Sequence, residues 1–188
     1  MGVPDPLTPP VVFLDRDGVI NQAYVRDGVS HPPASVEALE ILPGVPEALA
    51  RLRRAGFRLV VVTNQPDVAR GTQTREAVEA IHARLMAALP LDEIRVCYHD
   101  DADGCPCRKP KTALLTQGPP ADLAASIMVG DRWRDVEAGR RAGCATVFVE
   151  SGAPESLIHE PDARVASLAE AADWILARPG RQNIDAHR

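Results

Sequence analysis

The feature that most constrains the fold is the alternation of short apolar runs with segments of helical periodicity. Apolar runs of four to six residues predict buried strands at 11–14, 57–62, 94–98, 126–129 and 145–149. Segments with helical spacing of their apolar residues predict helices at 45–56, 74–89, 133–143 and 168–177. Such alternation indicates an α/β fold, with a central parallel sheet and helices on both faces.

The length and charge of the chain narrow its class. With 188 residues, 45% of them hydrophobic, we expect one domain over residues 1–188 with its core over 10–178. A formal net charge of −5 gives no electrostatic reason to expect nucleic acid or an anionic membrane as a partner. No stretch approaches the roughly 18 apolar residues of a membrane-spanning helix, and the N-terminal residues lack a secretory signal pattern. We therefore expect a cytoplasmic monomer.

Two aspartates directly follow the first predicted strand, in the stretch "VVFLDRDGVIN". Residues i and i+2 of an extended chain point the same way, so Asp15 and Asp17 should emerge together. Their place is the carboxyl end of a strand, where open α/β sheets bind ligands. Because close carboxylates repel, we expect a cationic group between or beside them.

Polar residues also follow other strands of the predicted sheet. Thr63, Asn64 and Gln65 come after the second strand, Asp131 comes after the fourth, and Lys109 follows the third through a cysteine-rich loop. Three carboxylates, a hydroxyl, an amide and a lysine suit phosphoryl transfer with Mg²⁺, which prefers carboxylate oxygens.

This chemistry assigns a role to each residue. Asp15 would attack phosphorus and form an aspartyl-phosphate, and Asp17 would serve as the general acid and then the general base. Mg²⁺ would be held by Asp15, Asp131 and the backbone carbonyl of Asp17, while Thr63 and Lys109 would hold the phosphoryl oxygens.

The ordered motifs resemble those of the haloacid dehalogenase (HAD) superfamily over residues 11–149. "DRDGVIN", "VVVTN", Lys109 and "MVGDRWRD" match its four motifs in order. The resemblance implies a Rossmann-like HAD fold with a minimal cap and the residue roles given above, and Asp135 matches the auxiliary acid of the fourth motif. Taken singly, each motif could be a solvated turn, a helix cap or a surface lysine. Together, after successive strands, they favour a catalytic site.

The stretch "CYHDDADGCPC" offers a second set of metal ligands over residues 97–107. Cys97, His99, Cys105 and Cys107 meet the tetrahedral requirement of structural Zn²⁺ and leave no open position. Reduced thiols or a disulfide are the rival interpretations, and a cytosolic compartment disfavours the disulfide.

The fourth cysteine and the other histidines have no predicted role in a site. Cys144 is expected to be a small core residue. We expect His31, His82, His159 and His187 to be ordinary surface or helix residues.

The cysteine loop followed by "CRKPK" resembles the histidinol-phosphate and heptose-bisphosphate phosphatase branch of the superfamily. The resemblance implies a small phosphorylated sugar as substrate, a heptose 1,7-bisphosphate losing its 7-phosphate. The implied substrate contacts are Asn21, Asn64, Gln65, Arg70 and Arg108.

Histidinol phosphate stays open as the substrate because the five-residue spacer between His99 and Cys105 is also similar to that enzyme. Pro66 and Asp67 depart from the family pattern and stiffen the loop after Gln65. The sequence also leaves open two other classes of protein: a phosphotransferase or phosphomutase, and a non-catalytic zinc-binding module.

Overall fold

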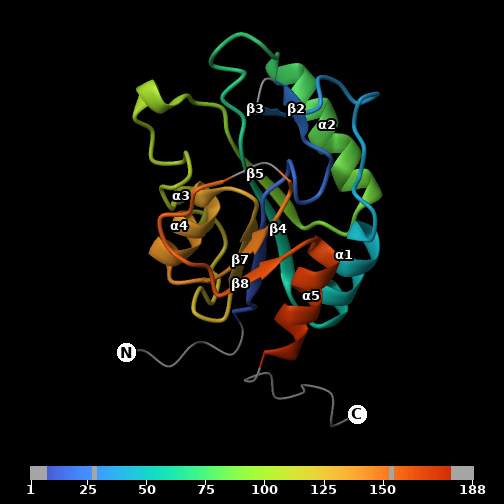
Figure 1. Cartoon of the computed structure of the whole chain (residues 1–188), viewed down its shortest axis with the longest axis vertical. Helices are drawn as coiled ribbons and strands as arrows, with labels where there is room; N and C mark the ends of the chain where they lie inside the picture. Colours follow the sequence, from blue (N-terminus) through green and yellow to red (C-terminus); the bar gives the residue numbers. More distant parts are fainter. Residues whose placement is uncertain (1–7, 27–28, 153–154, 179–188) are drawn as a thin grey trace.

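The computed structural model describes residues 8–26, 29–152 and 155–178. A six-stranded parallel sheet with the strand order β5-β4-β1-β6-β7-β8 forms its centre (Figure 1). Its strands are β1 (Val11–Leu14), β4 (Arg58–Asn64), β5 (Glu93–Cys97), β6 (Ile127–Gly130), β7 (Ala145–Val149) and β8 (Ala163–Val165). The parallel sheet and its five expected strands are confirmed, each within two residues of the predicted bounds.

Three short elements are absent from the sequence-based prediction. β8 is an edge strand of three residues whose middle side chain, Arg164, is exposed, so no apolar run marks it. β2 (Tyr24–Arg26) and β3 (Val29–His31) form an antiparallel hairpin between β1 and the first helix. Elements this short carry too few residues for a periodicity to be recognised.

Helices cover both faces of the sheet, as expected. They are α1 (Val45–Arg54), α2 (Arg75–Ala88), α3 (Ala113–Thr116), α4 (Trp133–Ala142) and α5 (Leu168–Ala177). Figure 1 shows α1 and α5 on one side of the sheet and α3 and α4 on the other. The short helix α3 was not predicted by the sequence pattern, which shows only a break in the alternation there.

The central strand β1 is buried on both faces. Val12 and Leu14 pack in the core that includes residues of α1, α2 and α5, whereas Val11 and Phe13 pack in the core beneath α3 and α4. All four side chains have no solvent exposure. Full burial of one such side chain contributes about 1.5–3 kcal/mol to the stability of the folded state. The packing of β1 on both faces therefore holds the residues that follow it in place.

Local chemistry sets the helix ends close to the expected positions. The hydroxyl of Thr74 accepts a hydrogen bond from the Ala77 N–H at 3.2 Å, so Thr74 caps α2 instead of being its first residue. Gly143 ends α4 with a φ of 82°, a conformation that glycine adopts without strain. The predicted ranges 74–89 and 133–143 therefore include capping residues.

The described residues also bear on the membrane and domain predictions. None of their helices is both long and apolar enough to cross a membrane. The single domain over residues 1–188, with its core at 10–178, stays a prediction because residues 1–7 and 179–188 lie outside the described ranges. Between β1 and α1 the described residues add only the β2–β3 hairpin, in agreement with a minimal cap.

Candidate active site

Three predicted site residues gather where neighbouring strands end. Asp15 follows β1, Thr63 lies near the end of β4, and Asp131 follows β6; these strands are adjacent in the sheet. The Asp15 N–H donates to the carbonyl oxygen of Val129 on β6 at 2.9 Å, which ties the two strand ends together. All three side chains line one cavity of about 380 Å³.

Lys109 is buried between two carboxylates of this cavity. Its Nζ lies 2.9 Å from Asp15 Oδ1 and 2.6 Å from Asp135 Oδ1, and it donates to the Val62 carbonyl at 2.7 Å. Burial opposes the ammonium charge, but Asp135 and Asp15 outweigh burial and raise the pKa of Lys109 above its ordinary value. The site therefore holds a permanent positive charge beside Asp15.

The carboxylates of Asp15, Asp131 and Asp135 crowd together. Oxygens of the three lie within 4.8 Å of one another. Burial, and then the charges of Asp15 and Asp135, raise the pKa of Asp131 well above its ordinary value. Burial also raises the pKa of Asp135 to about 6, although Lys109 acts in the opposite direction. Such crowding is relieved by a cation, and Lys109 supplies only one positive charge.

The donor set fits the predicted magnesium ion. Asp131 Oδ1 is buried and has no hydrogen-bond partner among the described residues, while Oδ2 accepts a hydrogen bond from the Ser151 hydroxyl at 2.8 Å. A hard divalent cation takes carboxylate oxygens of this kind as ligands. Asp15 and Asp131 can therefore hold Mg²⁺, with the third carboxylate, Asp135, engaged by Lys109.

Gly18 allows the backbone after β1 to approach Asp131 closely. A Cβ at this position would lie 2.3 Å from Asp131 Oδ2, and the φ of Gly18 is +86°. A larger residue would both clash and be strained, so the glycine of "DRDG" is required by the geometry of the site.

Asp17 also lines the cavity, but its carboxylate has different partners. It accepts hydrogen bonds from Arg16 Nη2 at 2.9 Å, Asn21 Nδ2 at 2.9 Å and Gln65 Nε2 at 2.8 Å. A cation was expected between or beside the two aspartates: Arg16 lies beside Asp17 and Lys109 lies beside Asp15. Asn21 has no solvent exposure and is not among the residues that line the cavity; its side chain holds Asp17, and its contact with a substrate stays a prediction.

Two residues at the end of β4 support their neighbours. Asn64 Oδ1 accepts from the Lys109 N–H and its Nδ2 donates to the Lys109 carbonyl, both at 3.1 Å. Gln65 donates to Thr63 Oγ1 at 3.0 Å as well as to Asp17. Asn64 and Gln65 both line the cavity, so these contacts do not remove them from reach of a ligand.

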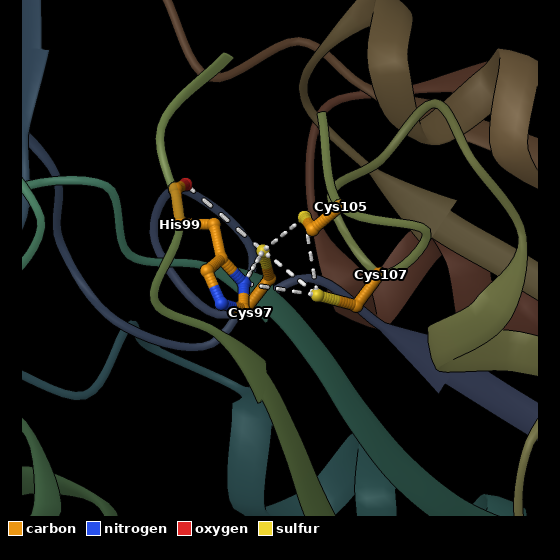
Figure 2. Close-up of side chains that lie close together, drawn as sticks. All are labelled: Cys97, His99, Cys105 and Cys107. Carbon is orange, nitrogen blue, oxygen red and sulfur yellow. Dashed lines mark hydrogen bonds between the residues drawn. The ribbon is translucent and has the colours of Figure 1, made fainter. Parts of the chain in front are cut away.

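The cysteine loop forms a compact cluster of ligand atoms (Figure 2). The Sγ atom of Cys107 lies 3.2 Å from that of Cys97 and 3.3 Å from that of Cys105, and His99 Nδ1 lies 3.3 Å from Cys107 Sγ. All three cysteines are free thiols, so the disulfide interpretation is not supported. Four ligand atoms within 4.8 Å of one another, three sulfurs and one nitrogen, fit a tetrahedral Zn²⁺ about 2.3 Å from each sulfur.

The chain is similar to known phosphatases. The HAD-hydrolase-like family model matches residues 106–171. The D-glycero-beta-D-manno-heptose-1,7-bisphosphate 7-phosphatase of Bordetella bronchiseptica is 37% identical over 153 residues, or 76% of this chain and 81% of that protein. The Escherichia coli protein of the same name is 36% identical over 183 residues, or 89% of this chain and 88% of that protein. The chain belongs to the heptose-bisphosphate phosphatase family of HAD-like hydrolases.

Solved structures of this phosphatase family share the fold. The crystal structure of the Bordetella bronchiseptica enzyme, complexed with magnesium and phosphate, has a TM-score of 0.73 at 34% identity and covers 89% of this chain and 98% of that one. The Burkholderia thailandensis enzyme has a TM-score of 0.64 at 30% identity and covers 90% of this chain and 99% of that one.

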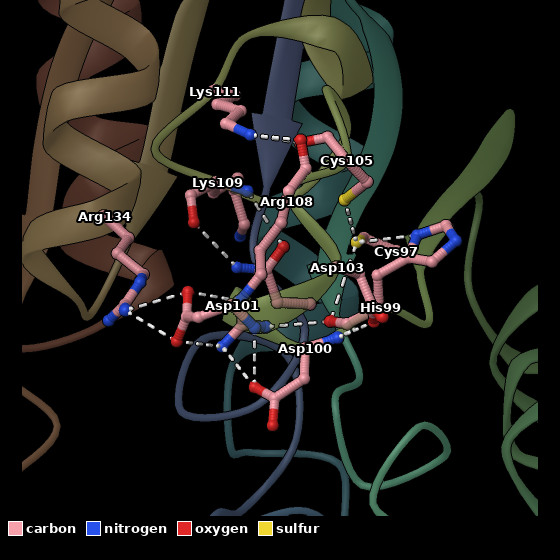
Figure 3. Close-up of polar contacts among 12 residues, drawn as sticks. Cys97, His99, Asp100, Asp101, Asp103, Cys105, Arg108, Lys109, Lys111 and Arg134 are labelled. Atoms are coloured by element: carbon pink, nitrogen blue, oxygen red, sulfur yellow. Dashed lines mark hydrogen bonds and ion pairs between the residues drawn. The ribbon is translucent and has the colours of Figure 1, made fainter.

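In this HAD-like phosphatase, arginines at the cavity are paired with acids of the cysteine loop. Arg70 donates from Nε and Nη2 to Asp100, both at 2.7 Å. Arg108 Nε donates to Asp101 at 2.8 Å, and Arg134 Nη2 lies 3.2 Å from the same carboxylate (Figure 3). The hydrogen bond from Arg70 lowers the pKa of Asp100 to about 2. Solvent screening weakens the more exposed pair of Arg70 with Asp100, so the Arg70 guanidinium can exchange it for a phosphate, whereas Arg108 is buried.

Several residues that line the cavity are not among the site residues predicted from the sequence. Arg132, Trp133 and Arg134 line the cavity as part of "GDRWRD", so their place within the fourth motif was the available signal. Glu155 also lines it and accepts from Arg132 Nη1 at 3.1 Å, although no local pattern marks this residue.

The histidines were expected to be ordinary surface or helix residues, and this is met in part: His159 is exposed at the surface, where it is hydrogen-bonded to Glu137, and His82 lies on α2. His31 differs because it lines the cavity from β3. His82 is 5% exposed, and its Nε2 lies 3.0 Å from Arg16 Nη1. His187 lies outside the described residues.

Proposed function

We propose that this protein removes the 7-phosphate of D-glycero-D-manno-heptose 1,7-bisphosphate through an aspartyl-phosphate intermediate, in the synthesis of nucleotide-activated heptose. The observation that carries the proposal is Asp15, a carboxylate at the end of a buried strand, 2.9 Å from the buried Lys109 ammonium and open to a cavity. Relatives that share 36–37% identity carry that enzymatic name, which supports the same substrate here.

The first step is transfer of the phosphoryl group to Asp15. A carboxylate oxygen of Asp15 forms a bond to phosphorus as the bond from phosphorus to the sugar oxygen breaks. Asp17, which lines the same cavity, donates a proton to the departing sugar oxygen. Lys109 and Thr63 hold the phosphoryl oxygens, and the ammonium charge offsets the negative charge that develops on them.

The second step regenerates the enzyme. Asp17, now deprotonated, takes a proton from a water molecule, whose oxygen attacks phosphorus and displaces the Asp15 carboxylate. When held by Asp15, Asp131 and the backbone carbonyl of Asp17, Mg²⁺ supplies positive charge that reduces repulsion between the carboxylates and the phosphate. The carboxylate crowding and the unpartnered Asp131 Oδ1 support this assignment.

Substrate recognition is assigned to residues around the reaction centre. Arg70 and Arg108 line the cavity and bind the second phosphate, since guanidinium pairs with phosphate in bidentate fashion. Asn64 and Gln65 contact the substrate from the end of β4.

Zinc is proposed as a structural ion of the cysteine loop. Held by Cys97, His99, Cys105 and Cys107, it would set the path of residues 97–107, and Arg108 and Lys109 follow directly. A cytoplasmic location, where thiols stay reduced, fits this use of cysteine. We also propose that the enzyme acts as a monomer, without nucleic acid or membrane partners.

Steady-state kinetics with Mg²⁺ test the substrate directly. We expect kcat/KM for heptose 1,7-bisphosphate to exceed that for histidinol phosphate by about 10²-fold, because only the bisphosphate offers the arginines a second phosphate. Equal or faster turnover of histidinol phosphate would replace the proposed substrate with that alternative.

A further inference from the structure

Arg16 is fully buried beside the general acid. Its guanidinium donates from Nε at 3.1 Å and from Nη2 at 2.9 Å to Asp17. The remaining nitrogen, Nη1, lies 3.0 Å from Nε2 of His82. Because a buried charged group is stable only when its donors are satisfied, His82 completes the environment of Arg16.

The roles of the two groups in this contact follow from their chemistry. Arginine can only donate, so His82 Nε2 must be the acceptor and the imidazole must carry its proton on Nδ1. Burial, and then the charge of Arg16, lower the pKa of His82 to about 4, so the ring is neutral at neutral pH. Glu79, 4.0 Å from Nδ1 on the same helix, and Asp17 act in the opposite direction but do not outweigh these effects.

Arg16 makes more hydrogen bonds to the Asp17 carboxylate than its other partners do. Asn21 donates to Oδ1 only and Gln65 to Oδ2 only, whereas Arg16 Nε contacts both oxygens and Nη2 adds a third contact. A guanidinium that lost its acceptor at Nη1 would turn toward another one and change its contacts with Asp17. The orientation of the general acid is thereby linked to a residue on α2.

We infer that His82 is a positioning residue, which orients the Arg16 guanidinium and through it sets the Asp17 carboxylate for proton transfer. The inference rests on the proposed function, because Asp17 has to be the group that protonates the leaving oxygen. Its consequence is specific: loss of the His82 contact should matter most when the leaving group needs a proton.

Two substrates separate proton transfer from general damage to the site. Heptose 1,7-bisphosphate has a sugar alcohol as leaving group and requires protonation, whereas p-nitrophenyl phosphate releases a stable phenolate that does not. The parameter kcat/KM reports on steps up to formation of the aspartyl-phosphate, so later hydrolysis of that intermediate does not affect it. Each variant is compared with wild type on each substrate, which cancels differences in binding between the substrates.

Two substitutions form a matched pair. In His82→Gln the amide oxygen takes the place of Nε2 and can still accept from Arg16. In His82→Asn the shorter side chain keeps a polar group near the position of Nδ1, toward Glu79, but does not reach Arg16. Both variants place an amide at the same buried position, so they differ mainly in the contact with Arg16.

We expect His82→Gln to stay within about threefold of wild type on both substrates. His82→Asn should lose at least about tenfold more kcat/KM on the sugar bisphosphate than on p-nitrophenyl phosphate. Equal losses on the two substrates, or equal behaviour of the two variants, would overturn the inference while leaving the proposed function intact. A wild-type protein that hydrolyses neither substrate would overturn both.

A measurement on the wild-type protein covers the case in which His82→Asn does not fold. Nitrogen NMR of the labelled protein identifies which ring nitrogen of His82 carries the proton. A proton on Nδ1 with Nε2 unprotonated supports the inference, and a proton on Nε2 overturns it because the ring could not then accept from Arg16.

Discussion

Two clusters of side chains that could hold a metal ion in this phosphatase are built in opposite ways. The reaction-centre cluster, Asp15, Asp131 and Asp135 with Lys109, comes from segments far apart in the sequence and is buried. The cysteine cluster, Cys97, His99, Cys105 and Cys107, comes from the single loop 97–107, and only Cys97 in it is buried.

The difference concerns how far regular secondary structure fixes the position of each cluster. Strands β1 and β6 place Asp15 and Asp131 side by side through their own hydrogen bonds and core packing. The cysteine loop has only the short 3-10 helix η1 (Asp101–Asp103) between its two pairs of ligands. We therefore expect the first cluster to keep its geometry without metal and the second to lose it.

The largest effect is expected at the nucleophile. Asp15→Asn keeps the shape of the side chain but removes the attacking carboxylate, so kcat should fall by at least about 10³-fold. Phosphate release with saturating Mg²⁺ measures it. Asp67→Asn is the control: Asp67 lines the cavity but is paired with Thr72, and its substitution should change kcat less than about tenfold. Substantial turnover by Asp15→Asn would refute the role of Asp15.

Lys109→Met tests the charge balance of the same cluster. Without its ammonium, Asp15 and Asp135 keep buried charges without a partner, so the free energy of unfolding should drop by about 3–5 kcal/mol. The loss of a charge at the phosphate should also lower kcat by about 10²-fold. Urea unfolding and steady-state kinetics measure the two effects.

Lys111→Met is the matched control for Lys109→Met. Lys111 lies two residues further along and donates to the carbonyl oxygens of Gly104 and Cys105, at 2.7 and 2.5 Å. Its removal leaves no buried charge, so stability and kcat should stay close to those of wild type. If both lysine variants lost the same amount of stability and kcat, the buried ion pairs of Lys109 would not be the cause of the losses.

Cys105→Ser tests the cysteine cluster. The variant should lose its stoichiometric zinc and about tenfold in activity, because the loop that leads to Arg108 and Lys109 loses its anchor. Elemental analysis of protein purified without chelator is the measurement, and Cys144→Ala, a buried cysteine outside the cluster, should retain the zinc. Less than about half an equivalent of zinc in fully active wild-type protein would contradict the site.

The smallest effect is expected for Arg108, which lines the cavity and directly follows the cysteine cluster in the chain. Arg108 follows Cys107 directly and is held by Asp101 of η1, so the cysteine loop determines where its guanidinium lies. Arg108→Ala should lower kcat/KM for the bisphosphate about tenfold more than for a sugar monophosphate, which offers no second phosphate to lose. The same loss on both substrates would place Arg108 at the reacting phosphate.

Much of the reaction centre could be predicted because strand ends mark it locally. Val11–Leu14 predict a strand by their apolar character alone, and Asp15 and Asp17 follow at fixed positions. The pairing of Lys109 with Asp135 was not predicted, since α3 and β6 separate these residues and the pattern within each segment does not show how the segments pack together. The contact of His82 with Arg16 was missed for the same reason: its helical spacing places His82 on α2 but does not show which segment α2 covers.

The amino-acid sequence by itself determined the parallel sheet, the order of the motifs and the two candidate sets of metal ligands. They follow from local patterns: the periodicity of apolar side chains, the polar residues at the ends of the predicted strands and the short spacing of the ligands within the cysteine loop. The tertiary structure alone decided that Asn21, Gln65 and Arg16 share the Asp17 carboxylate and that Asp131 Oδ1 stays without a partner. Contacts such as that between Asp17 and Gln65 join segments that follow different strands, β1 and β4, and only the packing of the crossover connections around the sheet brings their side chains within hydrogen-bonding distance.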